Sequence, residues 1–233
     1  MSVPVVIALG GNLGDVRATG DAALAQLNAT PGLEVQRTSR WYSTEPVGCD
    51  GRFLNSAALL QCELPPTQLL RRLLEIETAY GRVRTGHWTP RPLDLDLILF
   101  GQWQVADPRL KLPHPAAWCR RFVLDPACEV AGDFVHPDFS LTLDQLRDRL
   151  LTRPLAVAWE AELSLEAVTE GPVQTRFGDQ VRWAKAGELA LARFVPPANI
   201  ARGQFAVALP SNLHEARRIV METLTSMLDE PVA

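Results

Sequence analysis

Hydrophobic positions recur along the first 150 residues with two periods, one typical of β-strands and one typical of α-helices. Four runs predict β-strands, at 4–10, 33–44, 53–64 and 93–100. Apolar residues at helical spacing follow Asp15, and a second such stretch begins at Pro65-Pro66. The order strand, helix, strand, strand, helix, strand, with a helical tail, predicts an α+β sandwich on a mainly antiparallel sheet.

The pattern changes near Arg153-Pro154, so we expect a domain over residues 1–153 and a smaller α+β extension over residues 154–233. Short strand-like runs follow, at 157–168, 181–185, 189–195 and 204–210. A last helix after Ser211 or Asn212 carries an apolar stripe made by Ile219, Val220, Leu224, Met227 and Leu228. This stripe predicts packing on the N-terminal domain or on a second copy of the chain, as a homodimer. An independent ligand-binding module remains the alternative.

Charge, hydrophobic stretches and cysteine spacing limit the classes of binding partner and the location that we expect. The 233 residues carry a net charge of −4, which gives no reason to expect a nucleic acid or an anionic membrane. No apolar stretch reaches the ~20 residues of a membrane span, and the start lacks the basic region of a signal peptide. The four cysteines form no CxxC pair. We therefore expect reduced thiols and a cytoplasmic protein.

The stretch "RPLDLDLILFG" (91–101) contains two aspartates within a hydrophobic run. On a strand, Asp94 and Asp96 share one face with Ile98 and Phe100, while the leucines take the other. A solvent-facing strand surface is the plain alternative, but Ile98 and Phe100 on the same face do not suit it. Two carboxylates about 7 Å apart repel by roughly 2 kcal/mol at an effective dielectric near 20. Mg²⁺ reverses that balance and would in turn hold a polyphosphate.

Basic residues gather around the pair. They are Arg82, Arg84 and Arg91 before it, and Arg109, Lys111, Arg120 and Arg121 after it. Each alone is as well explained as a solubilising charge, but together they favour phosphate. His114, between two prolines, is either structural or a donor to a phosphate oxygen. The chain has no GxxxxGK[ST], and "GGNLG" does not fit GxGxxG, so a nucleotide site would be neither a P-loop nor a Rossmann site.

Seven motifs, in order, resemble the 6-hydroxymethyl-7,8-dihydropterin pyrophosphokinase family of folate synthesis. They are "ALGGNLGD", "YSTEPVG", "FLNSAALL", "YGRVR", "PRPLDLDLILFG", "LPHP" and "RRFVLDP". The resemblance runs from about residue 4 to about residue 150. It implies a ferredoxin-like βαββαβ fold, two Mg²⁺ ions, and transfer of the β,γ-diphosphate of ATP to the pterin hydroxymethyl group with release of AMP.

The same resemblance implies roles for individual residues. Asp94 and Asp96 would bind the metal and, with Arg82 and Arg91, form the catalytic set. The pterin pocket would comprise Thr44, Pro46, Val47, Gly48, Phe53, Asn55, Trp88 and Phe122. ATP would be bound by Glu77, Arg84, Ile98, Arg109, Lys111, His114 and Arg120. His87 and Thr89 stand where the family often has arginine and glycine.

Two rival functions are weighed. A non-catalytic pterin- or nucleotide-binding regulator is disfavoured by the intact Asp94/Asp96 pair. A bifunctional enzyme with a barrel partner would need ~250 further residues, and residues 154–233 are too few. Positioning dominates the expected chemistry, and we assign no general base.

Overall fold

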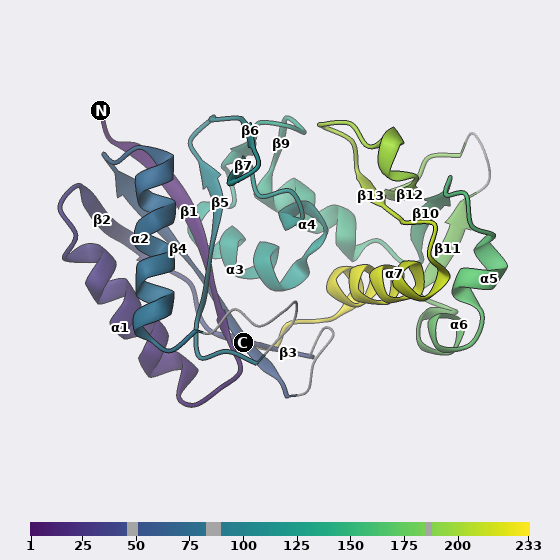
Figure 1. Ribbon diagram of the computed structural model, residues 1–233, viewed down its shortest axis with the longest axis horizontal. Coiled ribbons are helices and arrows are strands. Elements are labelled where there is room, and N and C mark those ends of the chain that lie inside the picture. Colours follow the sequence, from purple (N-terminus) through teal and green to yellow (C-terminus); the bar gives the residue numbers. More distant parts are fainter. Residues whose placement is uncertain (46–50, 83–89, 185–187) are drawn as a thin grey trace.

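The computed structural model describes residues 1–45, 51–82, 90–184 and 188–233 (Figure 1). An antiparallel sheet with its helices forms the left-hand part of that view, and a second, parallel sheet forms the right-hand part. No helix within these ranges is long and apolar enough to cross a bilayer. The chain is therefore a mixed helix and sheet protein whose N-terminal sheet is antiparallel, as predicted.

Five strands build the N-terminal sheet. They are β1 (Val3–Gly11), β2 (Leu33–Thr38), β3 (Tyr42–Thr44), β4 (Phe53–Cys62) and β5 (Asp94–Phe100). Their order is β2-β4-β1-β5. β3 pairs with the first residues of β4, on the same edge as β2, which pairs with the last ones. Every pairing in this sheet is antiparallel. The long central strand β4 thus carries both halves of the segment predicted as one strand over 33–44.

That predicted strand is interrupted at residues 39–41, although the Ser39 N–H still donates to the Ala57 carbonyl of β4 at 2.9 Å. The Trp41 ring lies over Gly20 of α1 (Val16–Asn28), where a Cβ would come within 2.4 Å of the indole. Gly20 is therefore required for this close contact. The interruption lets β3 pair separately with the first residues of β4, beside the site described below.

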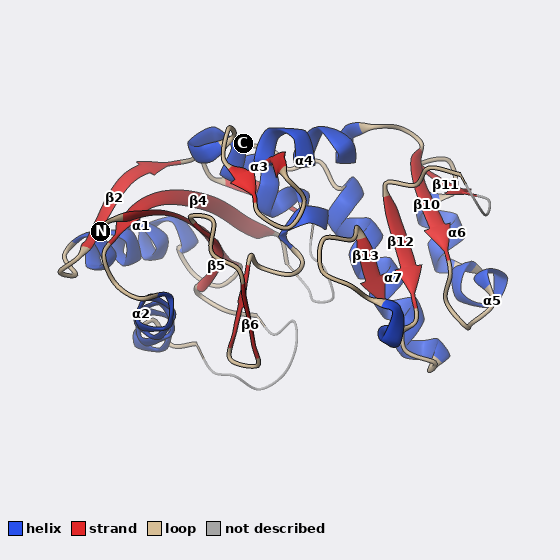
Figure 2. Ribbon diagram, turned by 90° about the horizontal axis from the view of Figure 1, so that it is seen from above, coloured by secondary structure: helices blue, strands red, loops and turns tan. Residues whose placement is uncertain are grey.

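Helices cover both faces of the sheet (Figure 2). α1 and α2 (Pro66–Ala79) share one apolar cluster with Val5, Ile7 and Leu9 of β1. α3 (Arg121–Ala131) and α4 (Leu143–Leu151) share the other with Val6 and Ala8. Alternate side chains of β1 thus pack into two different cores, one on each face of the sheet. The predicted cap of α1 is confirmed, because the Asp15 carboxylate accepts a hydrogen bond from the Ala18 N–H at 3.0 Å.

The alternation predicted for β5 is wrong beyond Leu97. Val6 pairs with Leu99 and Ile7 with Leu97, so Ile98 is the extra residue of a β-bulge. The bulge moves Leu99 to the same core as Ile98 and returns Phe100 to the core of the leucines. Asp94 and Asp96 precede it and keep their shared face.

Short elements connect the sheet to the C-terminal part. They are the hairpin β6 (Val105–Asp107) and β7 (Leu110–Leu112), η1 (Ala117–Cys119), and the pair β8 (Val135–His136) and β9 (Leu141–Thr142).

The extension, residues 154–233, is built on a four-stranded parallel sheet in the order β11-β10-β12-β13. Its elements are β10 (Leu155–Trp159), α5 (Leu165–Thr169), α6 (Pro172–Phe177), β11 (Val181–Ala184), β12 (Ala192–Val195), η2 (Pro197–Asn199), β13 (Ala206–Ala208) and α7 (Leu213–Leu228).

The strand predicted over 157–168 is wrong after Trp159. The Trp159 indole N–H donates to the Leu163 carbonyl at 2.7 Å, which folds the segment back. The Ser164 side chain then accepts from the Ala167 N–H and caps α5. The apolar alternation at Leu163 and Leu165 therefore belongs to a turn followed by a helix.

The extension packs on the N-terminal part, and one apolar cluster draws residues from both. The Phe205 ring lies between Phe139, at a centroid distance of 4.2 Å and an interplanar angle of 6°, and the Arg149 guanidinium, 3.8 Å above its centroid. The apolar stripe of α7 is covered within the chain, with Val220, Leu224 and Met227 fully buried.

Candidate active site

An aromatic hollow opens where β1, β3 and β4 meet the start of α3. Phe53 and Asn55 come from β4, Thr44 from β3 and Phe122 from α3, and all four line it. The Asn55 side chain is 7% exposed, and its Nδ2 donates to the Thr44 hydroxyl oxygen at 2.9 Å. This bond fixes the orientation of the amide. Asn55 therefore presents a carbonyl acceptor and a further N–H donor at the bottom of an aromatic pocket.

The two glycines of "LGGN" serve close packing here. A Cβ on Gly10 would lie 3.1 Å from Asn55 Oδ1, and one on Gly11 would lie 2.6 Å from the Pro92 carbonyl oxygen. Asn12 then binds the segment that precedes β5, because its Oδ1 accepts a hydrogen bond from the Arg91 N–H at 2.8 Å. The motif joins β1 to the segment before β5 and does not form a phosphate loop.

The carboxylate pair stands beside this hollow. Asp94 pairs in the sheet with Gly10 and Asp96 with Ala8, and both side chains line the aromatic pocket. The spacing of two residues on a strand puts their backbones about 6.6–7 Å apart. One oxygen of Asp94 accepts from Arg91 Nη2 at 2.7 Å, and the other pairs with Arg82. Asp94 is thus already an attachment point for cationic groups.

A buried carboxylate holds Arg82 in place. Glu77, near the end of α2, is 1% exposed, and it accepts a hydrogen bond from the Leu95 N–H at 2.8 Å. The same carboxylate pairs with Arg82, whose guanidinium then reaches Asp94. Glu77 therefore connects the helix, the strand and the arginine.

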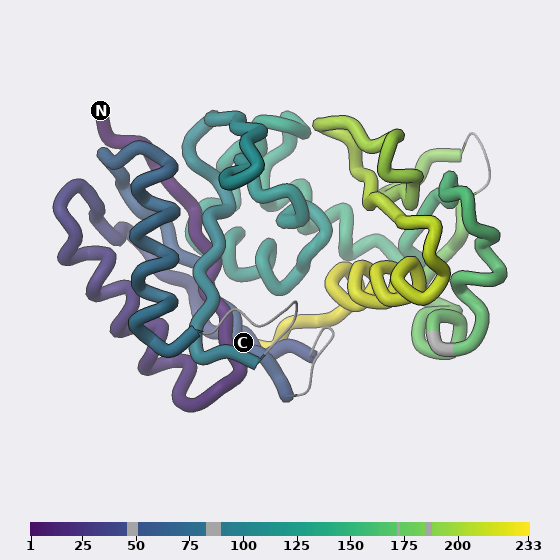
Figure 3. Tube along the Cα trace, viewed as in Figure 1, coloured from purple at the N-terminus to yellow at the C-terminus, as the bar shows by residue number. Residues whose placement is uncertain are grey.

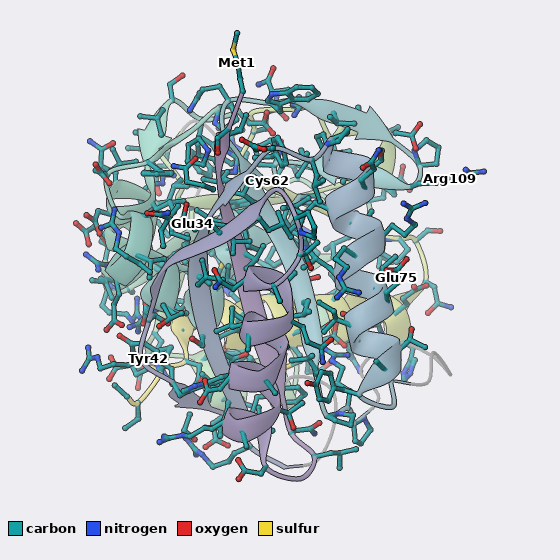
Figure 4. All side chains as sticks on the ribbon, turned by 90° about the vertical axis from the view of Figure 1, so that its left-hand side faces the viewer. Met1, Glu34, Tyr42, Cys62, Glu75 and Arg109 are labelled. Carbon is teal, nitrogen blue, oxygen red and sulfur yellow. The ribbon has the colours of Figure 1, made fainter. Side chains whose placement is uncertain are left out.

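A second hollow, of about 290 Å³, lies on the other side of β5. Its charged and polar lining comprises Glu77, Arg82, Asp96, Arg109, Lys111 and His114. Leu70 and Leu74 of α2 add an apolar wall. Figure 4 looks onto the face covered by α1 and α2, and the exposed Arg109, between β6 and β7, extends outward at the edge of the molecule. Asp96 lines both hollows, so the carboxylate pair stands where they meet.

His114 is held as a neutral imidazole. Its backbone N–H donates to the Ile98 carbonyl, at the bulge, at 3.0 Å. Its Nδ1 accepts from the Ala116 N–H at 3.2 Å, so the ring proton sits on Nε2. Burial and the nearby Arg120 charge lower the pKa of His114 to about 3. At neutral pH it is a hydrogen-bond donor without a charge.

Two guanidinium groups lie over the aromatic pair. Arg91 is 5.7 Å from the Phe53 ring centroid, and Arg120 is 5.7 Å from that of Phe122. Cations at this distance are attracted by the ring faces. The two arginines thus sit at the boundary between the aromatic hollow and the charged residues.

Several predicted site residues lie outside the described residues: Pro46, Val47, Gly48, Arg84 and Trp88, together with His87 and Thr89. The Ile98 side chain is fully buried in the core, so its carbonyl is the part that faces His114. Sequence reasoning missed Asn12, Leu70 and Leu74. Asn12 was signalled by "GGN", whereas the leucines, one turn apart on α2, had no signal distinct from an ordinary helix face.

An acidic pair stands between an amide-bearing aromatic hollow and a cationic one. This arrangement suits the class of enzymes that transfer a phosphate-containing group to a ring compound. A family model described as 7,8-dihydro-6-hydroxymethylpterin-pyrophosphokinase (HPPK) matches residues 6–132, more than half of the 233 residues. The chain belongs to this family and is a transferase of the pyrophosphokinase type that acts in folate biosynthesis.

Curated relatives agree. A 2-amino-4-hydroxy-6-hydroxymethyldihydropteridine pyrophosphokinase of Synechocystis is 40% identical over 165 residues, which cover 69% of this chain and 85% of that protein. One of Methylorubrum extorquens is 44% identical over 131 residues, covering 55% and 83%. A solved structure described as HPPK-DHPS in complex with substrates has a TM-score of 0.51 at 11% identity, covering 63% of this chain and 43% of that one. At that identity the likeness concerns the fold alone.

Proposed function

We propose that this protein transfers the β,γ-diphosphate of ATP to the hydroxymethyl group of 6-hydroxymethyl-7,8-dihydropterin and releases AMP. The single observation that carries the residue assignment is the place of Asp96, which lines both the aromatic and the cationic hollow. A group handed from one ligand to the other would pass this carboxylate. The family membership supports the same reaction.

The pterin would occupy the aromatic hollow. A flat heterocycle stacks well between Phe53 and Phe122, and its edge of donors and acceptors matches the fixed amide of Asn55. Thr44 serves the pocket by holding that amide. The hydroxymethyl group would then face the acidic pair.

ATP would occupy the cationic hollow, with Leu70 and Leu74 as an apolar wall. Arg82 lines this hollow and would neutralise charge on the triphosphate, with Arg91 and Arg120, which lie over the rings of Phe53 and Phe122, adding to this from the side of the aromatic hollow. His114 donates from Nε2. Arg109 and Lys111 approach from the β6–β7 hairpin. Such fixed charges stabilise the transferring group as negative charge spreads over its oxygens.

Asp94 and Asp96 would hold Mg²⁺, with two ions expected when ATP is bound. The donor set fits, since hard carboxylate oxygens suit this ion, and Asp94 already attracts two guanidinium groups. The described residues contain no group of three or more His, Cys, Asp or Glu that could hold a metal, and Mg²⁺ commonly takes one or two carboxylates with water and phosphate oxygens. When bound, Mg²⁺ neutralises charge on the diphosphate during transfer.

The rival reading, a non-catalytic regulator, is not favoured by membership in a pyrophosphokinase family. The decisive experiment measures AMP and diphosphorylated pterin with Asp94→Asn and Asp96→Asn. We expect each to lose more than about 100-fold in kcat while keeping the native fold, as measured by circular dichroism. Glu160→Gln, which removes an exposed carboxylate in the extension, is the matched control. Near-normal AMP release by either site variant would refute the metal assignment.

Finer expectations remain proposals. The strand order β2-β4-β1-β5 and the helix positions support a ferredoxin-like assignment. We propose a division near Arg153-Pro154 into two domains and a cytoplasmic location. The argument for a homodimer came from an uncovered stripe on the last helix. Within the described residues the chain itself covers that stripe, which removes the argument.

A further inference from the structure

The last residues of the chain return to the pterin side of the N-terminal sheet. Figure 3 shows the yellow tail leaving α7 and running towards β3. Val232 forms an antiparallel bridge with Ser43, with N···O distances of 2.6 and 3.0 Å. The Asp229 carboxylate accepts from the Glu45 N–H at 3.0 Å. The tail thus binds the residues on both sides of Thr44.

Thr44 is the residue that holds the pocket amide. Its side chain is 3% exposed, and its hydroxyl oxygen accepts from Asn55 Nδ2 at 2.9 Å. Glu45 itself lines the aromatic hollow. A displacement of β3 would therefore move the partner that orients Asn55. The tail is two residue contacts away from the group that would recognise the pterin edge.

The extension makes a second contact, at a neighbouring hollow that shares Lys111 and His114 with the cationic one. Arg202 pairs with Asp138, with Nε 2.5 Å from Oδ1, and donates through Nη2 to the Leu112 carbonyl. Leu112 ends β7, the strand that carries Lys111, and His114 follows two residues later. Arg202 therefore fixes the segment from which two proposed ATP ligands project.

Both contacts come from a body that is itself held in place. Asp229 caps the C-terminal end of α7, with its N–H bound to the Thr225 carbonyl at 2.9 Å, and Thr225 is buried. The stacking of Phe205 between Phe139 and Arg149 anchors the segment that follows Arg202. The contacts are thus set by packed elements of the extension.

We propose that the extension is a positioning device for the transfer reaction, acting on both substrate walls. Asp229 and the Val232 backbone position β3 and, through Thr44, the pterin-reading Asn55. Arg202 positions the end of β7 at the ATP hollow. This inference rests on the assignment of the two hollows proposed above, and it makes Asp229 and Arg202 positioning residues that touch neither substrate.

The pterin wall is tested in the full-length enzyme. Asp229→Ala removes the acceptor for the Glu45 N–H, and Val232→Pro removes the N–H that donates to the Ser43 carbonyl. Val232→Ala keeps that N–H and is the matched control for the proline. We expect the two disrupting variants to raise the Kd and KM for the pterin roughly five- to tenfold, because a less ordered wall must be fixed on binding. The KM for ATP should change less than about twofold.

The ATP wall is tested with Arg202→Gln, which should give the reverse split, a higher KM for ATP with little change for the pterin. Arg193→Gln and Glu160→Gln, the two halves of an exposed ion pair in the extension, should leave both constants unchanged. A merely structural role would lower the amount of active enzyme and so alter kcat without separating the two substrates.

Asn55→Ala is measured by calorimetry alongside, to separate two ways of failing. If Asn55→Ala weakens pterin binding while Asp229→Ala and Val232→Pro leave it unchanged, the positioning role of the tail is refuted. If Asn55→Ala also leaves pterin affinity unchanged, the aromatic hollow is not the pterin pocket and both proposals fall. Equal changes for ATP and pterin in every extension variant would likewise overturn the division between the two walls.

Discussion

Glu77 is the residue whose replacement tests the architecture of the site most sharply. The residue is 1% exposed, and its carboxylate contacts include the Leu95 N–H at 2.8 Å and the Arg82 guanidinium. Glu77→Ala removes both of these contacts at once, whereas Glu77→Gln keeps an acceptor oxygen for Leu95 and removes the charge that faces Arg82. The pair of variants therefore separates the hydrogen bond from the ion pair.

The expected losses follow from these contacts. A buried N–H left without a partner costs about 1–3 kcal/mol. Breaking a buried ion pair costs about 3–5 kcal/mol, but Arg82 retains Asp94 and is 18% exposed, so we take the low end or less. Glu77→Ala should thus destabilise the fold by about 3–4 kcal/mol, and Glu77→Gln by about 1–2 kcal/mol. For a chain of this size these losses lower Tm by roughly 6–16 °C and 2–8 °C.

The assay combines thermal unfolding with steady-state AMP release. Both variants should also lose kcat, because Arg82 is then held by Asp94 alone and is less well placed for the triphosphate. A loss below about 1 kcal/mol for Glu77→Ala would refute the reasoning, since an orphaned Leu95 N–H would then cost nothing. Equal losses for both variants would show that the charge matters and the hydrogen bond does not.

Three further predictions follow from single contacts. Asn55→Ala should weaken pterin binding at least tenfold more than ATP binding in calorimetry, because it removes the edge-reading amide. Phe122→Ala should do the same by about 1–2 kcal/mol through lost stacking, and equal weakening of ATP would contradict it. Burial lowers the pKa of His136 from 6.5 to about 4, so the unfolded chain takes up its proton first. The free energy of unfolding should therefore fall as the pH drops from about 6.5 to 4, with this residue contributing at most about 1.4 kcal/mol per pH unit. His136→Phe should flatten this part of the dependence of the unfolding free energy on pH, as measured by urea unfolding.

Local signals in the sequence were sufficient where the structure is decided locally. Asp15 accepts an N–H hydrogen bond as a helix cap, as predicted, and of the two predicted candidates for the last helix, Ser211 and Asn212, it is Asn212 that does so. The shared face of Asp94 and Asp96 follows from the period of a strand and needs no knowledge of its neighbours. The residue identities around the pair were therefore enough to indicate a phosphate site.

Non-local pairing decided the features that the sequence did not reveal. The bulge at Ile98 is set by the register of β5 against β1, about 90 residues earlier in the chain. An apolar alternation at Leu163 and Leu165 suits a strand as well as it suits a turn and a short helix, and the Trp159 indole bond settles it. The meeting of the two hollows at Asp96 likewise depends on how α2, α3 and the β6–β7 hairpin pack around one strand.

The return of the tail to β3 has a consequence for biosynthesis. Glu45 and Asp229 are 184 residues apart, so the ribosome adds 184 residues after Glu45 before the chain contains the carboxylate that binds its N–H. The N-terminal part can collapse earlier around the core that α1 and α2 share with β1, yet a nascent chain that has not reached Asp229 lacks the carboxylate that binds the Glu45 N–H. Closing so long a loop costs only slightly more conformational entropy than closing a shorter one. The wall of the aromatic hollow formed by β3 and Glu45 would then gain these contacts only after the ribosome has added Asp229 and Val232.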